Sequence, residues 1–190
     1  MKAALGCISE IQVGYQSRER IKPAPFGSHR LIQARDFNKL GQVQWSNLIR
    51  FTPSGNPSKS ELRQSDVLFL AKGQENFAYL VNTNVTNILA ANTFYILRAH
   101  QESILPNFLV WWLNQTPAQE YIQLNRSGSS LPFLSVSVLS RLEVPIPELE
   151  MQRKIGELEM LRKKEADLLD LYLSKKSALI QTVCLNAIIE

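Results

Sequence analysis

The sequence has little of the chemistry that marks secreted, metal-binding or membrane-spanning proteins. Its two cysteines, Cys7 and Cys184, lie near opposite ends of 190 residues. Two distant cysteines make no disulfide framework, and with His29 and His100 they show no zinc-ligand spacing. The longest apolar run, residues 108–113, falls far below the roughly 18 residues of a membrane span, and no signal-peptide pattern opens the chain. We expect free thiols, no metal and a soluble cytoplasmic protein.

Motifs of catalysis are also missing. There is no Gly-x-x-x-x-Gly-Lys phosphate loop, and no glycine-rich cofactor loop follows a strand. Residues 56–59, Asn-Pro-Ser-Lys, come nearest to the Asn-Pro-Pro-aromatic tetrapeptide of amino-methyltransferases, but they lack its second proline and its aromatic. The two histidines have no nucleophile at motif spacing, and the carboxylates are scattered. We therefore expect a chain that is not an enzyme by itself and needs no cofactor.

Positive charge is present, and it is unevenly placed. Residues 1–147 hold 14 Lys and Arg against 9 Asp and Glu, whereas residues 148–190 hold 7 against 8. Since Lys and Arg attract anionic partners, this asymmetry favours a basic domain that binds an anionic partner, joined to a neutral structural arm.

Short β-like runs and turn formers alternate through the first part of the chain. The strand candidates are rich in β-branched and aromatic residues and are bounded by turns; they are residues 29–34, 66–70, 77–81 and 92–97. Pro106 suits the first turn of an apolar helix that buries Trp111 and Trp112 in the core. Thr116-Pro117 breaks this helix before a second piece, residues 118–124.

From residue 147 the pattern changes to unbroken helical periodicity. Residues 148–190 contain no proline and one glycine. Apolar residues follow one another at steps of three and four, and the positions that form the seam are Leu158, Leu161, Leu168, Tyr172 and Leu179. Glu165 and Lys175 interrupt this seam, so it favours a two- or four-stranded bundle over a perfect zipper. A helix of this length would extend roughly 57 Å, so most of it would project and need a partner.

The expected fold is therefore α+β. Residues 1–146 would form a compact mixed domain, and residues 147–190 would form one long projecting C-terminal helix of the coiled-coil kind.

The entry into that helix carries a resemblance to a known family. The segment V-P-I-P at 144–147, followed by L-E-x-Q-x-x-I at 149–155, resembles the junction between a target recognition domain and its spacer helix in type I restriction–modification specificity subunits. Further segments agree with the family in order: L-x-x-I-S-E-I-Q-x-G at 5–14, R-L-I-Q-A-R-D-F at 30–37, L-R-Q-S-D-V-L-F-L-A-K-G at 62–73, N-T-F-Y-I-L-R at 92–98, L-P-N-F-L-V-W-W-L-N at 105–114 and R-S-G-S-S-L-P-F-L-S at 126–135.

The resemblance implies a sequence-specific DNA-binding subunit without activity of its own. It would direct modification (methyltransferase) subunits, and with them a restriction subunit, to a bipartite target in double-stranded DNA. Full-length members carry two recognition domains and two spacer helices, whereas this sequence has one of each, as a half-subunit would. Residues 147–190 would then be the spacer and dimerisation helix, pairing as a homodimer or with a second specificity half.

Polar side chains of the expected loops are the candidates for DNA contacts. Planar amides and guanidinium groups suit base edges, whereas lysines, arginines and small hydroxyl groups suit phosphates. The candidates are Arg18, Arg20, Lys22, Arg35, Lys59, Lys72, Gln74, Asn76, Arg126, Ser127, Ser129 and Ser130. Among them Arg35, Gln74 and Asn76 are expected at base edges, and Lys59, Lys72 and Arg126 at phosphates. The alternative function is a coiled-coil assembly or adaptor protein whose basic domain binds protein.

Overall fold

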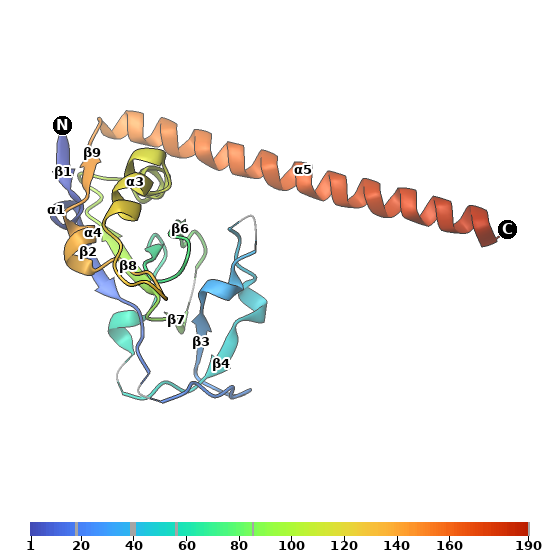
Figure 1. The fold of residues 1–190 in the computed structure, drawn as a ribbon, viewed down its shortest axis with the longest axis horizontal. Helices are drawn as coiled ribbons and strands as arrows, with labels where there is room; N and C mark the ends of the chain where they lie inside the picture. The colour runs from blue at the N-terminus through green and yellow to red at the C-terminus, as the bar shows by residue number, and fades with distance from the viewer. Residues whose placement is uncertain (18, 39–40, 56, 85, 190) are drawn as a thin grey trace.

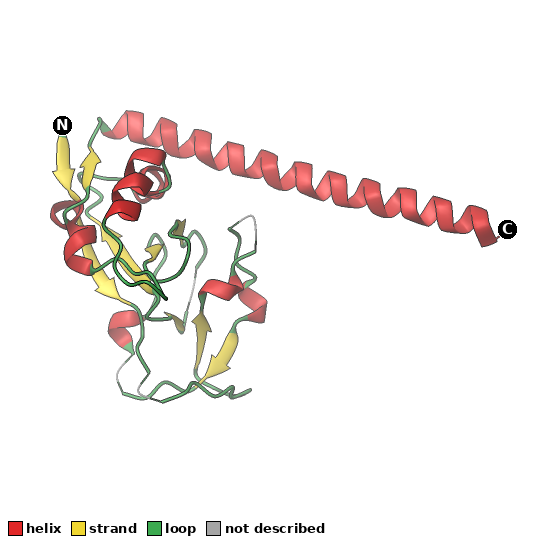
Figure 2. Cartoon of the chain, in the orientation of Figure 1, coloured by secondary structure: helices red, strands yellow, loops and turns green. Residues whose placement is uncertain are grey.

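The computed structural model describes residues 1–17, 19–38, 41–55, 57–84 and 86–189. A body built from three small sheets and short helices continues into one long helix, α5 (Leu149–Ile189), which runs straight out from it (Figure 1). Helices and strands mix along the body, while the C-terminal arm is helical throughout (Figure 2). The α+β class with a projecting helix is therefore confirmed. Cys7 and Cys184 are both exposed and free, as expected.

The middle layer of the body is a four-stranded antiparallel sheet in the order β2-β8-β5-β6. Its strands are β2 (Ser9–Val13), β8 (Phe94–Ala99), β5 (Val67–Leu70) and β6 (Ala78–Leu80). Every residue of β5 is buried, because the sheet is covered on both faces. Val67 and Phe69 face one core, and Leu68 and Leu70 face another, as the alternation of a strand requires.

Helices cover the first face of this sheet. They are α1 (Leu5–Ile8), α2 (Pro106–Leu113), α3 (Thr116–Leu124) and α4 (Val136–Ser140), beside a two-stranded sheet of β1 (Lys2–Ala4) and β9 (Glu143–Pro145). Pro106 begins α2, as expected. The expected break is present, but it lies at Asn114 and Gln115, so α3 already begins at Thr116 and includes Pro117. Trp111 and Trp112 are only half-buried at the edge of the core, whose centre is filled by Phe108 and Leu109 instead.

A three-stranded sheet covers the second face, in the order β4-β3-β7. Its strands are β4 (Ile49–Phe51), β3 (His29–Ile32) and β7 (Ile88–Ala90), and the 3₁₀ helices η1 (Ala34–Asp36), η2 (Trp45–Asn47) and η3 (Ser58–Ser60) lie in its connections. Between the two sheets the ring of Phe37 contacts Phe77, Tyr79 and Phe94 at centroid distances of 5.1, 5.1 and 5.6 Å. This packing fixes the two sheets against each other.

One buried glutamine joins the N-terminal turn of α5, the root of the helix, to the body by hydrogen bonds. Gln152 is 0% exposed, and its Oε1 accepts from the amide of Leu105 at 2.8 Å. Its Nε2 donates to the carbonyls of Ser103 and Pro147 at 3.0 and 2.8 Å. One turn later, a Cβ at Gly156 would lie 2.9 Å from the Cβ of Asn107, so glycine lets α5 approach α2 closely. The glutamine of the L-E-x-Q segment thus sets the direction in which the helix leaves the body.

Candidate nucleic-acid interface

Loops gather at the end of the central sheet that lies away from α5. Strands β2 and β5 both pair antiparallel with β8, and Val13, Tyr95 and Phe69 share one row. The loop after β2 (residues 14–28) and the turn after β5 (residues 71–77) therefore leave the same end of the sheet. The other end of β8 leads toward Ser103 and Leu105, where α5 is fixed. The candidate DNA contacts in these loops therefore lie away from the helix root (Figure 1).

Two of the expected loops lie against each other. Ser127 and Phe133 exchange main-chain hydrogen bonds of 2.9 and 2.8 Å, and Gly73 donates to the carbonyl of Pro132 at 3.0 Å. A further bridge pairs Lys72 with Phe133. The structure thus brings Lys72 and the exposed Gln74 together with the exposed hydroxyl groups of Ser127, Ser129 and Ser130. Small side chains there leave main-chain N–H groups accessible, as phosphate-binding loops require.

Two of the predicted DNA contacts form hydrogen bonds within the body of the protein. Asn76 is buried, and its Nδ2 donates to the carbonyl of Leu70 at 2.8 Å. A buried amide bonded to main chain cannot reach a DNA groove, so the expectation of base reading by Asn76 is corrected. Arg126 donates through Nη2 to the carbonyl of Gly73 and through Nη1 to Gln123 at 3.1 Å. It braces the two loops, and its expected contact with a phosphate stays a prediction.

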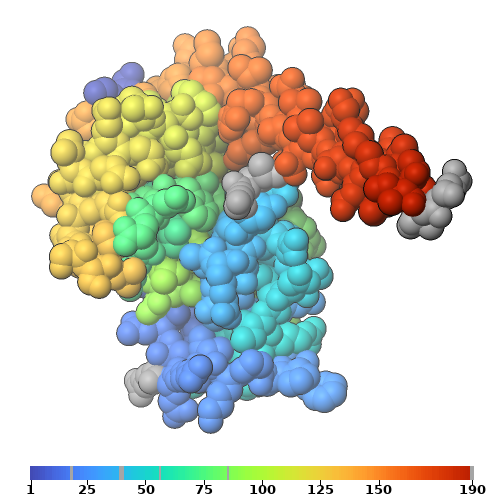
Figure 3. Space-filling model, turned by 45° about the vertical axis from the view of Figure 1, so that its right-hand side comes forward, coloured from blue at the N-terminus to red at the C-terminus, as the bar shows by residue number. Residues whose placement is uncertain are grey.

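The excess positive charge has a narrower source than the sequence halves indicated. Residues 14–60 hold eight Lys and Arg against two Asp and Glu. They form the loop before β3, the strands β3 and β4 and the 3₁₀ helices. In Figure 3 these residues, blue to cyan, extend from the end of the body opposite α5 up to α5 itself, where Gly41, Gln42 and Val43 line a cleft beside that helix. A concentration of one sign of charge on one part of the surface raises the local concentration of anions such as DNA.

Two arginines in this region were missed by sequence reasoning. Arg30 and Arg50 are direct partners in the antiparallel β3–β4 register. Side chains in such a pair point to the same face, and like charges placed there repel. Among the described residues no acidic side chain forms an ion pair with either arginine. An unneutralised pair of this kind is typical of a surface that binds an anion, and only the strand register could have revealed it.

The other basic candidates occupy three places. Arg20 and Lys22 are exposed in the loop before β3, and Arg18 lies outside the described residues. Lys59 in η3 lines an open hollow with Tyr15, whose hydroxyl accepts from the amide of Ser54 at 2.9 Å. This bond ties the loop that carries Lys59 to the loop after β2. Arg35 is exposed in η1, which follows the opposite end of β3 from Arg20 and Lys22.

Hydrogen bonds and one ion pair connect these loops to the central sheet. Arg98 on β8 pairs with Asp66 at 3.1 Å and donates to Gln12 and to the carbonyl of Glu61, each at 3.1 Å. Burial raises the pKa of Asp66, while hydrogen bonds from the amide of Arg63 and from Arg98 oppose that rise. The carboxylate of Glu61 also forms a hydrogen bond with His29 Nε2 at 2.9 Å. The network joins the central sheet to β3 through the segment that follows Lys59.

The side chains of Ser28, His29 and Glu61 superficially suggest a nucleophilic triad. Ser28 Oγ lies 2.8 Å from His29 Nδ1, and Glu61 contacts Nε2. In a serine hydrolase the two ring nitrogens have the reverse partners. Here the contacts link residue 61 to the start of β3, and we assign them a structural role.

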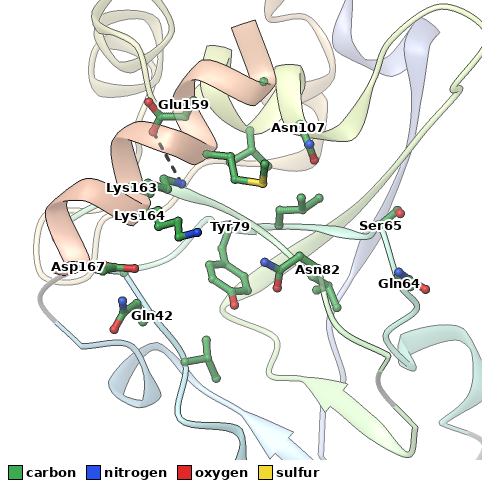
Figure 4. Close-up of a pocket in the computed structure, with 17 residues that line it drawn as sticks. Gln42, Gln64, Ser65, Tyr79, Asn82, Asn107, Glu159, Lys163, Lys164 and Asp167 are labelled. Carbon is green, nitrogen blue, oxygen red and sulfur yellow. Dashed lines mark ion pairs between the residues drawn. The ribbon is translucent and has the colours of Figure 1, made fainter. Parts of the chain in front are cut away.

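A cleft of about 520 Å³ lies between α5 and the edge of the body. Figure 4 shows Lys163, Lys164 and Asp167 of α5 facing Tyr79, Asn82 and Gln42 across it. Hydrogen bonds from Arg162 lower the pKa of Glu159, and burial raises the pKa of Tyr79. Arg162 and Lys163 thus pair with Glu159 along α5. Among the described residues that line the cleft, no nucleophile lies next to a base. Over the described residues, no cluster of His, Cys, Asp or Glu could hold a metal ion.

The seam of α5 faces away from the body. Successive residues of an α-helix turn by about 100°, so Gln152, Ile155, Gly156 and Glu159 occupy one side of α5. The seam positions fall on roughly the opposite side. All are exposed, by 57–69%, and they are Leu158, Leu161, Leu168, Tyr172 and Leu179. A partner helix could therefore lie along α5 without displacing the body. Within the described residues, no helix is both long and apolar enough to cross a membrane.

The fold, with its long C-terminal helix, is similar to that of type I restriction–modification specificity subunits. The crystal structure of the HsdS subunit from Thermoanaerobacter tengcongensis matches 95% of this chain with a TM-score of 0.62 and 19% identity. The crystal structure of the S subunit of the type I system from M. genitalium matches 89% of it with a TM-score of 0.60 and 16% identity.

The relative identified by sequence is the type I restriction enzyme HindI specificity subunit of Haemophilus influenzae, 28% identical over 102 residues. That alignment covers 52% of this chain and 22% of the relative, and the structural matches cover 46% and 40% of their chains, so the chain spans less than half the length of these relatives. No protein-family model matches the sequence. The resemblance drawn from the junction and the ordered segments is thereby confirmed.

Proposed function

We propose that this chain binds double-stranded DNA in a sequence-dependent manner, as a specificity component of a type I restriction–modification system. The observation that carries the proposal is the sequence similarity to the HindI specificity subunit, because it does not depend on the fold match. Residues 1–146 would be the target recognition domain, and residues 147–190 the spacer and pairing helix. Acting in the cytoplasm, the chain would direct modification and restriction subunits to a bipartite target.

The DNA-facing surface of this proposal is the loop end of the central sheet together with the basic face of β3 and β4. Phosphates would be held by Arg20, Lys22, Arg30, Arg50, Lys59 and Lys72. Gln74, which is exposed beside the serine loop, is the candidate for base edges. Ser127, Ser129 and Ser130 would donate to phosphate oxygens from the same loop cluster. Arg35 keeps its base-edge assignment on a separate part of the surface.

The proposed subunit is not an enzyme on its own. Methyl transfer, DNA cleavage and ATP hydrolysis would belong to the modification and restriction subunits. A third structural match, with a TM-score of 0.59 and 21% identity, comes from a structure described as the structural basis of complex assembly and conformational transition of the type I system. A subunit that takes part in such an assembly needs surfaces for protein partners as well as for DNA.

Pairing through α5 would supply the second half of a bipartite reader. Burying one leucine contributes roughly 1.5–3 kcal/mol, so the exposed seam is strongly biased toward association. Two copies around a twofold axis form the simplest closed assembly. An antiparallel pair would place the recognition domains at opposite ends of the helices, and the target would then consist of two inverted half-sites. A second, different specificity half would pair in the same way.

The test begins with selection of bound duplexes from a random 40-base-pair pool, with the purified chain alone and with its modification subunits. Enrichment of a common sequence, with affinity that falls steeply as salt rises, is expected. A parallel incubation with S-adenosylmethionine should show no methyl transfer by the chain alone. Failure to retain duplexes in either form would contradict the proposal and favour an adaptor whose basic domain binds protein.

A further inference from the structure

One phenylalanine is exposed to solvent within the basic region, which we define as residues 14–60. Phe26 is 99% exposed, in the loop between β2 and β3. Isolated exposed apolar side chains are ordinary on protein surfaces. The turn beneath this one, however, is fixed to the body in a way that a solvent-facing loop does not need.

Two contacts hold the turn against β4, and a third closes the turn on itself. The amide of Ala24 donates to the carbonyl of Arg50 at 2.8 Å, and the amide of Gly27 closes the turn on Ala24 at 2.8 Å. Gly27 is buried so tightly that a Cβ there would lie 2.4 Å from the carbonyl carbon of Phe51. Pro25 restricts the backbone immediately before Phe26. The aromatic ring is therefore held out by a stiff support.

The surroundings of the ring are cationic. Arg50 donates through Nη1 to the carbonyl of Gly27 at 3.5 Å, which places its guanidinium group beside the turn. Lys22 is exposed four residues before Phe26. Arg30, the strand partner of Arg50, donates through Nη1 to the carbonyl of Trp45 at 3.5 Å, toward the other end of the strand pair. In duplex DNA the phosphates border each groove, so side chains bound to phosphates bring a central apolar group to the base pairs. A protein partner would need acidic groups opposite Arg50 and Lys22.

We propose that Phe26 contacts base pairs of the bound duplex as an apolar wedge that partly unstacks one base step. This rests on the proposed DNA-binding function and adds a residue that reads how easily a step opens. Wedges of Phe, Leu or Ile inserted between steps kink duplex DNA and thereby favour flexible steps. The ring needs no hydrogen bond for this, because every base has an apolar face.

The test uses the full-length chain and one duplex selected from the random pool, carrying 2-aminopurine at one position at a time. Binding should raise 2-aminopurine fluorescence at one step, because the probe brightens when it unstacks. Phe26→Ala should abolish that rise and weaken affinity by roughly five- to hundredfold. Phe26→Trp should retain both. The slope of log affinity against log salt should stay unchanged in Phe26→Ala, because no phosphate contact is lost.

Leu124→Ala is the matched control, since Leu124 is 85% exposed at the end of α3 and lies outside the basic region. It should behave like the unaltered chain. Unchanged affinity and fluorescence in Phe26→Ala, with the unaltered chain binding normally, would overturn the wedge alone. A loss of affinity with a smaller salt slope would also overturn it, by showing that the turn acts only through phosphates. If the unaltered chain bound no duplex, the proposed function and the wedge would both fall.

Discussion

Replacing Gln152 by alanine tests whether one buried side chain sets the course of α5. The substitution removes three hydrogen bonds of 2.8, 3.0 and 2.8 Å. It also leaves the Leu105 amide and the Ser103 and Pro147 carbonyls without this partner. Gln152 is 0% exposed, so water reaches these groups only if the root of the helix opens.

The size of the effect follows from the groups left unpaired. A buried polar group without its partner costs about 1–3 kcal/mol. The amide carries most of that cost, because a carbonyl oxygen has a second lone pair and tolerates the loss better. We expect Gln152→Ala to lower the free energy of unfolding by about 3 kcal/mol. Gln152→Glu should be at least as damaging at pH 7, because it places a charged carboxylate against two carbonyl oxygens.

Chemical denaturation followed by circular dichroism measures this loss. Gln101→Ala is the matched control, since Gln101 is exposed in the same connection between β8 and α2, and surface changes of this kind stay within about 0.5 kcal/mol. Acidification should narrow the deficit of Gln152→Glu, because the protonated acid regains a donor. A loss below about 1 kcal/mol in Gln152→Ala would refute the assignment of Gln152 as the anchor of the helix root.

Three further outcomes are expected. Arg50→Gln should lower the slope of log affinity for duplex DNA against log salt by about one, while leaving stability equal or slightly higher because the repulsion with Arg30 is relieved; an unchanged salt slope would exclude the β3–β4 face from the interface. Leu161→Asp with Leu168→Asp should make the chain monomeric by sedimentation without changing the melting of the body, whereas Leu185→Asp, on the other side of α5, should not; the reverse pattern would refute the seam. Arg98→Ala should destabilise the body by about 3 kcal/mol at neutral pH. The deficit arises from the ionised Asp66 carboxylate left without its cation. Burial raises the pKa of this carboxyl, so the deficit should shrink as the pH falls and Asp66 becomes protonated; a deficit that grew on acidification would contradict the pairing.

Local signals in the sequence were sufficient for α2, α3 and α5 and for the strands β3, β5, β6 and β8, whereas β2, α1 and α4 were not among the predicted elements. Pro106 and Thr116-Pro117 restrict the backbone around themselves, so the boundaries of α2 and α3 could be predicted without any tertiary information. Strands β4 and β7 have three residues each, and their partners are distant in sequence: Leu89 pairs with Leu31. These two short strands are held in the sheet by their pairing with β3, which lies between them. No local sequence pattern reveals that pairing.

The candidate interface shows the same division. Exposed loop residues such as Lys22, Lys59 and Gln74 were expected from composition and turn formers, and they do lie in accessible loops. The buried state of Asn76 depends on the carbonyl of Leu70 above it, and the Arg30–Arg50 pair depends on strand register. Both arise from contacts between residues that sequence periodicity treats separately.

The recognition loops and the root of α5 leave opposite ends of the central sheet, and the seam turns away from the body. A loop can therefore lengthen, shorten or change its charges without disturbing Gln152 or the helix that meets a partner. Conversely, a different partner helix along the seam would leave the loops of the body unchanged. Under the proposed function, substitutions in these loops would change the DNA preference of the chain and leave the residues that fix α5 unchanged.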